Sequence, residues 1–362
     1  MKKLISLVFV LGIMSVFCIT GCSDDKAPAN NAKQSGETED LATALANMKP
    51  MNLKMPISLA DSHALTAGFR DWCNEVERVT DGKIKITIYP SGSLIKSGSI
   101  YIGVRDGVAE VGEEDVAYNP NEFPLFSAFF LGGFSFPNTV AASVAANEWI
   151  KADFKEYTYV KMLWAYSMPP SVLMGNKKIE KLEDLKGTQV RVTGFCKDTI
   201  ERLGGTPVGI TMPETYDALL KGTVDVNLSN PGVLGKPNNL SEVSKYVTIC
   251  PGISYIPHPI FMNLNIWNSI PTVVQAEIEK LSLPASINTG KIAEKYYNDG
   301  LKAARDKDIP INEISPEEMN RWYNILEAQH SDWIKEKAAR GNSQTANDLL
   351  FELVTKYADY TD

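Results

Sequence analysis

The chain has 362 residues, enough for one or two domains with substantial cores. Its formal net charge of −8 argues against a nucleic-acid-binding protein, which would need a basic surface. A function that involves binding an anion would therefore require a local cationic site.

The N-terminal segment has the composition of an export signal. Two lysines precede an apolar stretch at 4–20, which is too short for a comfortable membrane span. The following Thr-Gly-Cys completes a resemblance to the bacterial lipobox, which predicts a lipoprotein signal peptide at 1–22 with Cys22 lipidated. An ordinary cleaved signal with an incidental cysteine is the alternative. Residues 23–50 are mostly polar and small, and predict a flexible tether.

Strand and helix patterns alternate through the next region. Alternating or continuous apolar residues predict strands, and apolar residues at helical spacing predict helices. In chain order these segments are a strand at 52–60, a helix at 63–80, a strand at 83–90, a short helix that ends near 107 and a strand at 108–112. This order predicts a mostly parallel sheet with right-handed crossovers.

The pattern then repeats with a different beginning. A helix at 138–150 leads into apolar strands at 159–167 and 171–176, which we interpret as the route from one lobe to another. A second unit has strands at 187–194, 206–211 and 223–229 and helices at 196–205 and 213–222. Two such units predict two lobes with a ligand cleft between them.

Helical patterns dominate the C-terminal third. Pro271 starts a long helical pattern that Pro284 is expected to bend or break, and Pro316 starts another helix. Trp322 and Trp333 lie on the apolar face of that helix, which indicates core positions.

Neither the cysteines nor the histidines form a catalytic or metal-binding motif. Cys73, Cys196 and Cys250 lack a C-x-x-C spacing, so we expect free thiols or at most one disulfide, and no metal or cofactor. The three histidines belong to no metalloprotease pattern, and no nucleophile-elbow or Walker motif is present. Cys196 at a helix start is the remaining candidate nucleophile, but no histidine lies near it in sequence. We therefore expect a protein that is not an enzyme.

An arginine interrupts a predicted buried strand. Residues 182–194 read LEDLKGTQVRVTG, and Arg191 stands between two valines. A buried guanidinium needs a partner, which is either a ligand carboxylate or a buried Asp or Glu of the protein. The guanidinium suits a ligand carboxylate because its planar fork makes two parallel hydrogen bonds and stays charged.

Several segments together resemble the solute-binding proteins of tripartite ATP-independent periplasmic (TRAP) transporters, the DctP-like family. Their order and spacing carry the resemblance, and the DLKG segment that precedes Arg191 is the most specific part. The resembling segments lie at 70–94, 100–112, 178–194, 200–226 and 262–281.

The resemblance implies an α/β, two-lobed periplasmic-binding-protein fold that is type II-like, with an interlobe cleft, crossing strands and a long C-terminal helix that spans both lobes. It also implies that Arg191 holds the carboxylate of an organic acid, and that the protein delivers this acid to a membrane permease. The protein is then expected to be periplasmic or otherwise extracytoplasmic, and anchored to a membrane by its lipid. The alternatives are an ABC-importer receptor for another small molecule and a surface adhesion or scaffold module. The predicted domains are lobe 1 at 51–170 with part of 258–285, lobe 2 at 171–257, and the long helix with further helices at 271–362.

Further candidate ligand contacts are polar, aromatic or sulfur-bearing residues near strand ends or lobe crossings. They are His63, Tyr118, Tyr166, Met168, Asn230, Tyr255 and His258. The alternatives are Ser229 in place of Asn230, a helix cap for His63, and hinge packing for the others. Asn227 is expected to face the sheet or solvent. The tyrosines favour a ligand with an apolar or ring-bearing body.

Overall fold

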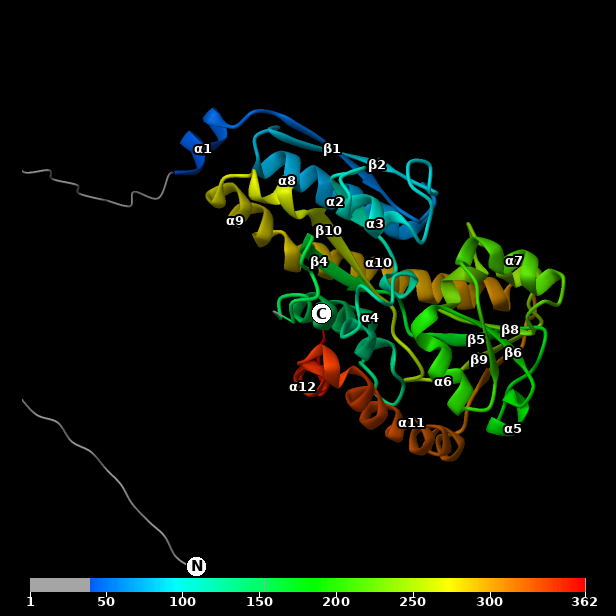
Figure 1. Cartoon of the computed structure of the whole chain (residues 1–362). Coiled ribbons are helices and arrows are strands. Elements are labelled where there is room, and N and C mark those ends of the chain that lie inside the picture. The colour runs from blue at the N-terminus through cyan, green and yellow to red at the C-terminus, as the bar shows by residue number, and fades with distance from the viewer. Residues whose placement is uncertain (1–39, 153, 362) are drawn as a thin grey trace, which may run out of the picture. The chain divides into compact units, whose positions relative to one another are not determined.

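The computed structural model describes residues 40–152 and 154–361, which belong to one unit of the chain, Glu39–Asp362 (Figure 1). The predicted signal peptide, the lipidation site Cys22 and most of the predicted tether lie outside the described residues. Within the described ranges, no helix combines the length and apolarity that a membrane crossing requires.

The segment before the first strand is a folded helix. Helix α1 (Leu41–Asn47) begins after Asp40, whose side chain accepts a hydrogen bond from the Thr43 amide. Ala44 is buried, and α1 packs against α9 (Thr272–Lys280). Residues 41–47 of the predicted tether are therefore helical and packed against the protein.

A parallel strand pair and two helices form one part of lobe 1. Strand β1 (Met51–Pro56) is followed by α2 (Ala64–Val79) and β2 (Ile84–Tyr89), and the two strands pair in parallel. Apolar residues at helical spacing give α2 its buried face. Helix α3 (Ile100–Arg105) follows. The predicted strand-helix-strand order is confirmed here.

The strands that cross between the lobes run antiparallel. Strand β10 (Pro257–Asn263) pairs with β3 (Val111–Glu113) on one side and with β4 (Val160–Ser167) on the other. Strand β4 leads out of lobe 1 and β10 leads back into it, so they run in opposite directions. The predicted mostly parallel sheet is therefore wrong for this part of the lobe. Helix α4 (Thr139–Trp149) packs against β4.

Lobe 2 contains a six-stranded mixed sheet in the order β11-β9-β5-β8-β6-β7. The predicted parallel unit is confirmed, because β6 (Gln189–Val192) lies between its parallel neighbours β7 (Thr206–Gly209) and β8 (Val226–Ser229). The sequence did not predict β11, since three residues at a sheet edge leave too short a pattern. The other elements are β5 (Val172–Gly175), β9 (Tyr246–Ile249), β11 (Ile311–Glu313), α5 (Leu182–Leu185), α6 (Lys197–Arg202) and α7 (Met212–Leu220).

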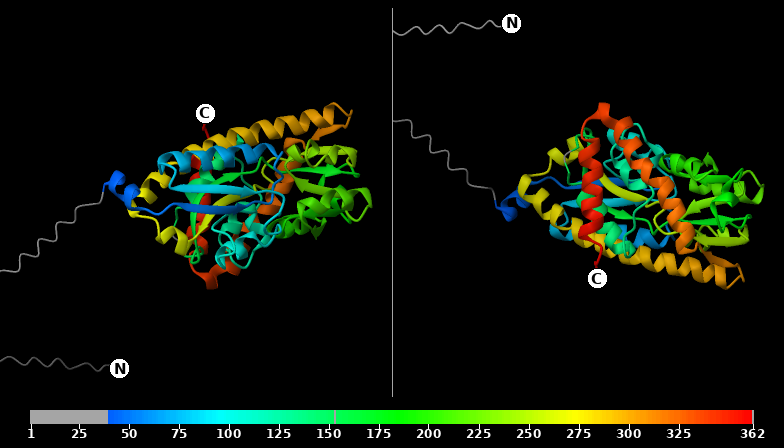
Figure 2. Two further views of the ribbon diagram at one scale, coloured as in Figure 1. Left: turned by 90° about the horizontal axis from the view of Figure 1, so that it is seen from above. Right: turned by 90° about the horizontal axis from the view of Figure 1, so that it is seen from below.

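One long helix spans both lobes. Helix α10 (Ser282–Arg305) packs against α2 and α4 of lobe 1 and against the 3₁₀ turn η4 (Pro231–Leu234) of lobe 2 (Figures 1 and 2). The helical pattern predicted from Pro271 is divided at Leu281 into α9 and α10. Pro284 lies in the first turn of α10, where proline is tolerated because its missing amide proton would have no intrahelical acceptor.

Two further helices follow. Helices α11 (Pro316–Lys337) and α12 (Ser343–Lys356) are orange and red in the view from below in Figure 2. Gln329 of α11 accepts from the Gly132 amide of lobe 1 and donates to Thr199 Oγ1 of lobe 2, so α11 also contacts both lobes. The remaining short elements are α8 (Leu264–Asn268), η1 (Val116–Tyr118), η2 (Phe126–Phe130), η3 (Gly194–Cys196), η5 (Leu240–Glu242) and η6 (Ala338–Arg340).

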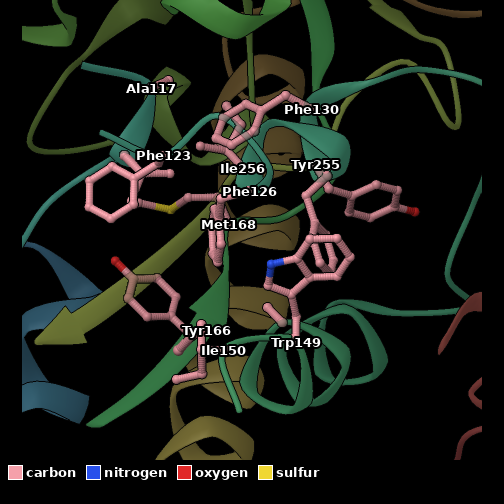
Figure 3. Close-up of a cluster of buried hydrophobic side chains, with 14 of the residues drawn as sticks. Ala117, Phe123, Phe126, Phe130, Trp149, Ile150, Tyr166, Met168, Tyr255 and Ile256 are labelled. Atoms are coloured by element: carbon pink, nitrogen blue, oxygen red, sulfur yellow. The ribbon is translucent and has the colours of Figure 1, made fainter. Parts of the chain in front are cut away.

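Aromatic side chains fill much of the core (Figure 3). Trp149 of α4 packs edge to face on Phe126, with ring centroids 6.3 Å apart. Tyr166 belongs to the same buried cluster. Trp322 and Trp333 of α11 are also buried, so their predicted core positions are confirmed.

Candidate functional site

A cavity of about 950 Å³ lies between the two lobes. Residues that follow β1 and β3 line it from lobe 1, and residues at the ends of β6, β7 and β8 line it from lobe 2. The carboxyl ends of strands are the common ligand sites of open α/β sheets. Met168 and Ile256 add apolar surface where the backbone passes from one lobe to the other.

Arg191 on β6 is the buried cation of this cavity, with 1% of its surface exposed. Its Nε donates to the Ile210 carbonyl at 2.9 Å, and its Nη1 donates to Asn227 Oδ1 at 3.4 Å. Its Nη2 has no hydrogen-bond partner. Within residues 40–152 and 154–361, no ion pair joins Arg191 to a carboxylate. The described residues therefore do not show the alternative in which Arg191 pairs with a buried Asp or Glu of the protein. An unpaired buried cation is costly, and an anionic ligand would offset this cost.

The end of β8 lies beside this arginine. Ser229 and Asn230 line the cavity, and Asn230 Oδ1 is buried without a hydrogen-bond partner. Asn227 is fully buried and accepts from Arg191, where the sequence predicted a side chain that faces the sheet or solvent. It therefore supports the arginine from the neighbouring strand.

His63 both caps a helix and lines the cavity. Its Nδ1 accepts from the Leu65 amide at the start of α2, and its ring packs 4.7 Å from that of Tyr296. Burial lowers the pKa of His63 to about 4, against a smaller opposing effect of the Glu113 charge. The imidazole is therefore neutral near neutral pH.

A buried network connects the two crossing strands. His258 lines the cavity, and its Nδ1 lies 2.7 Å from Glu113 Oε1. The Tyr166 hydroxyl donates to the same oxygen at 3.0 Å. Burial lowers the pKa of His258, but the hydrogen bond and charge of Glu113 outweigh burial and place this pKa above its ordinary value.

Tyr166 and Tyr255 are not among the residues that line the cavity. Tyr166 is fully buried and uses its hydroxyl on Glu113. Tyr255 stacks on Phe134 at 5.6 Å, and its hydroxyl accepts from the Phe136 amide at 2.9 Å. Both tyrosines therefore match the hinge-packing alternative, because their polar ends have partners inside the protein.

The other six predicted residues line the cavity, and Tyr118 is the tyrosine among them. Burial and the charge of Asp115 raise the pKa of the Tyr118 hydroxyl to about 12, and Arg191 opposes this shift. Asp115 itself lines the cavity and was not predicted. Its position three residues after the strand predicted at 108–112 was the available signal. The sequence also missed other lining residues. They are Ser58, Leu59, Ala60, Ser91, Gly92, Lys96 and Ser97 of lobe 1, Ile256 at the crossing, and Thr193, Thr211, Met212, Pro213, Glu214, Tyr216, Val233, Pro237, Asn238, Asn239, Leu240 and Glu242 of lobe 2.

The described residues contain no group of three or more His, Cys, Asp or Glu side chains that could hold a metal ion. Cys73, Cys196 and Cys250 are buried free thiols. Burial raises the pKa of Cys73 and of Cys250 to about 12, and it also raises that of Cys196. Such thiols are poor nucleophiles because the reactive thiolate is disfavoured.

Residues 57–337 match the family described as DctP, bacterial extracellular solute-binding protein, family 7. A TRAP periplasmic solute-binding protein of Desulfovibrio salexigens is 30% identical, with a TM-score of 0.75 over 86% of this chain and 98% of that one. Its structure is an open complex with the C-terminus of a symmetry mate bound in the ligand-binding site.

Two other relatives extend this comparison. A marine metagenome TRAP solute-binding protein, specific for aromatic acid ligands and crystallised with 3-hydroxybenzoate, is 26% identical, with a TM-score of 0.78 over 86% of this chain and 100% of that one. An uncharacterized protein of Haemophilus influenzae is 30% identical over 212 residues, which cover 57% of this chain. That match spans 63% of the Haemophilus influenzae protein, less than two thirds of its length.

Proposed function

Because the chain belongs to the DctP family of bacterial extracellular solute-binding proteins, the periplasmic receptors of TRAP transporters, we propose that it captures a small organic acid through Arg191. Members of this family are solute receptors and not enzymes. In the proposed complex, the guanidinium of Arg191 binds the carboxylate of the ligand in the interlobe cavity.

The observation that carries the proposal is the unpartnered Nη2 of a buried arginine that lines the cavity. A carboxylate would accept from the guanidinium and neutralise it, and such charge-assisted hydrogen bonds are about twice as strong as neutral ones. The Desulfovibrio salexigens relative offers a chemical parallel, because the C-terminus bound in its ligand-binding site carries a carboxylate.

Apolar side chains in the same cavity suit the body of such an acid. Leu59, Met168, Val233 and Ile256 line it from both lobes and from the crossing segments. A relative that is specific for aromatic acids supports the same ligand class. Binding would bury this apolar surface and favour closure of the lobes, since closure is favourable only when ligand contacts improve in the closed state.

Delivery to a TRAP permease and anchoring through a lipid on Cys22 complete the proposal. The family membership supports the permease as partner. The lipobox-like segment that ends at Cys22 supports the anchor.

The direct test is isothermal titration calorimetry of the purified protein with carboxylic acids and neutral sugars. We expect binding of carboxylates by the wild type and none by Arg191→Ala. Arg202→Ala is the matched control, because Arg202 also lies in lobe 2 but pairs with Asp198 and Asp332 outside the cavity. Binding of neutral sugars alone would favour the ABC-type alternative, and unchanged binding by Arg191→Ala would refute the role of this arginine.

A further inference from the structure

The cavity contains one buried carboxylate among its three acidic residues. Glu214 and Glu242 line its lobe 2 side but are exposed, and both have protein partners. Glu214 accepts from the Thr211 amide, and Glu242 accepts from the Tyr216 hydroxyl. Asp115 is only 4% exposed, so its carboxylate is far less accessible to bulk water than those of Glu214 and Glu242.

Asp115 uses only part of its hydrogen-bonding capacity. Its Oδ1 accepts from the Ala117 amide at 2.9 Å, which caps η1. Its Oδ2 makes no hydrogen bond with any described residue, although an ionised carboxylate offers about four acceptor sites. Burial raises the pKa of Asp115 above its ordinary value and outweighs the His258 charge, the Ala117 amide and the Arg191 charge, which lower this pKa. A donor from a ligand would further stabilise the ionised carboxylate.

A second buried acceptor lines the same cavity. Asn230 is 4% exposed, and its Oδ1 has no partner in the described part of the protein. Arg191 supplies the complementary donor, and no ion pair joins Arg191 to Asp115 within the described residues. The cavity therefore combines an unused cationic donor with unused acceptors, one of them a carboxylate oxygen.

We propose that Asp115 is a specificity-determining residue that accepts a hydrogen bond from a hydroxyl or N–H group of the ligand. The receptor then selects organic acids that carry such a donor in addition to their carboxylate. This inference rests on the proposed function, in which Arg191 binds the carboxylate.

The physical reason for selection is the cost of leaving Asp115 without a donor. An acid that lacks a donor excludes water from Asp115 but makes no hydrogen bond to it. The Asp115 carboxylate therefore loses hydrogen bonds when such an acid binds. An acid with a second carboxylate at this position would meet a like charge in a poorly solvated site. A hydroxy or amide-bearing acid avoids both penalties.

The test compares acids that differ by one hydroxyl group. The probes are three pairs, namely propionate with lactate, benzoate with 3-hydroxybenzoate, and phenylacetate with mandelate, titrated into the full-length protein by calorimetry. In at least one pair we expect the hydroxy acid to bind about ten- to a hundred-fold more tightly, as for a hydrogen bond to a charged group. Asp115→Asn retains an acceptor for the Ala117 amide, and we expect it to reduce this ratio about ten-fold.

The control is Asp106→Asn, which makes the same substitution at an exposed position of lobe 1 that does not line the cavity, and it is expected to retain the wild-type ratio. Equal binding within every pair, no binding of any of the six acids, or an unchanged ratio in a folded Asp115→Asn would each overturn the inference. If Asp115→Asn fails to fold, Asp115→Ser, which can also accept from the Ala117 amide, is compared in the same way, because the wild-type ratios alone do not distinguish Asp115 from Asn230. Equal binding that Arg191→Ala abolishes would leave the proposed function intact, whereas hydroxy-acid binding that survives in Arg191→Ala would refute the proposed function.

Discussion

Arg191 and Asn227 lie directly opposite each other on the adjacent parallel strands β6 and β8, and the arginine Nη1 donates to Asn227 Oδ1 at 3.4 Å. The partners of the guanidinium are this amide and the Ile210 carbonyl, both of which are uncharged. They orient Arg191 without cancelling its charge. The unpartnered Nη2 therefore remains available for a ligand anion.

Replacing Asn227 with Asp tests this arrangement. Asn227→Asp has nearly the same shape but offers Arg191 a carboxylate inside the protein, which would compete with the carboxylate of the ligand. We expect organic-acid affinity to fall by roughly 2 to 3 kcal/mol, which corresponds to about a hundred-fold. Asn227→Ala, which removes the orienting hydrogen bond and adds no charge, should cost about 1 kcal/mol.

Calorimetry of the two variants with the tightest-binding acid gives the comparison. Asn227→Asp keeps an oxygen that can accept from Arg191 and Asn227→Ala does not, so a weaker affinity of Asn227→Asp than of Asn227→Ala reports the added charge. Equal affinities of Asn227→Asp and Asn227→Ala would show that charge neutralisation of Arg191 does not limit binding.

How much of the site the sequence predicts depends on the kind of signal each residue leaves. Arg191 was predictable because a charged residue between valines breaks an apolar strand pattern. Asn227 was not, because its importance depends on the register that places it opposite Arg191 on a strand distant in sequence. Asp115 lies in a run of three acidic residues, and only the fold distinguishes it from Glu113, which is committed to His258.

Tyr166 and Tyr255 are residues that the sequence predicted for the site but that do not line the cavity. Both lie near the lobe crossings as predicted, but nearness to a crossing does not determine whether a hydroxyl faces the cavity or the core.

The fold was also only partly predictable from the local sequence pattern. The alternation of strands and helices gives the two lobes, whereas the antiparallel pairing of β4 with β10 follows from where the backbone leaves lobe 1 and returns to it.

The buried role of Tyr166 leads to a prediction about stability. Tyr166→Phe removes the donor to Glu113 Oε1, a fully buried carboxylate whose Oε2 already has no partner. We expect the free energy of unfolding to fall by about 1 to 3 kcal/mol, because a buried acceptor loses a hydrogen bond. Ligand affinity should change little, since Tyr166 does not line the cavity. Urea unfolding and calorimetry measure the two effects separately.

Tyr216→Phe is the matched control for that experiment. Its hydroxyl donates to the exposed Glu242, so its loss should cost less than about 1 kcal/mol. A large loss of affinity in Tyr166→Phe at unchanged stability would contradict the structural role and place this tyrosine at the ligand.

His63 makes stability depend on pH. Its pKa is lowered from 6.5 to about 4 in the folded state, so between these pH values the unfolded protein binds a proton that the folded protein does not. Stability must therefore fall as pH falls through this window. Relative to pH 7, the contribution at about pH 4.5 is a loss of roughly 2 to 3 kcal/mol.

His63→Asn isolates this effect, because asparagine can cap α2 but does not titrate. Urea unfolding of both proteins near pH 7 and near pH 4.5 gives the comparison. The variant should lose less stability than the wild type on acidification, whatever its stability at pH 7. Parallel losses would show that His63 does not resist protonation in the folded state.

The crossing of α10 over lobe 2 depends on the absence of a side chain at Gly300. A Cβ there would overlap the Pro231 carbonyl oxygen, which belongs to the backbone of η4. Gly300→Ala would ordinarily stabilise a helix by about 1 kcal/mol, but here it must push α10 away from lobe 2. We therefore expect a net destabilisation of about 1 to 3 kcal/mol in urea unfolding. Asn298→Ala, at an exposed position of the same helix, should have a small effect, and a stabilised Gly300→Ala would contradict the close contact between α10 and η4.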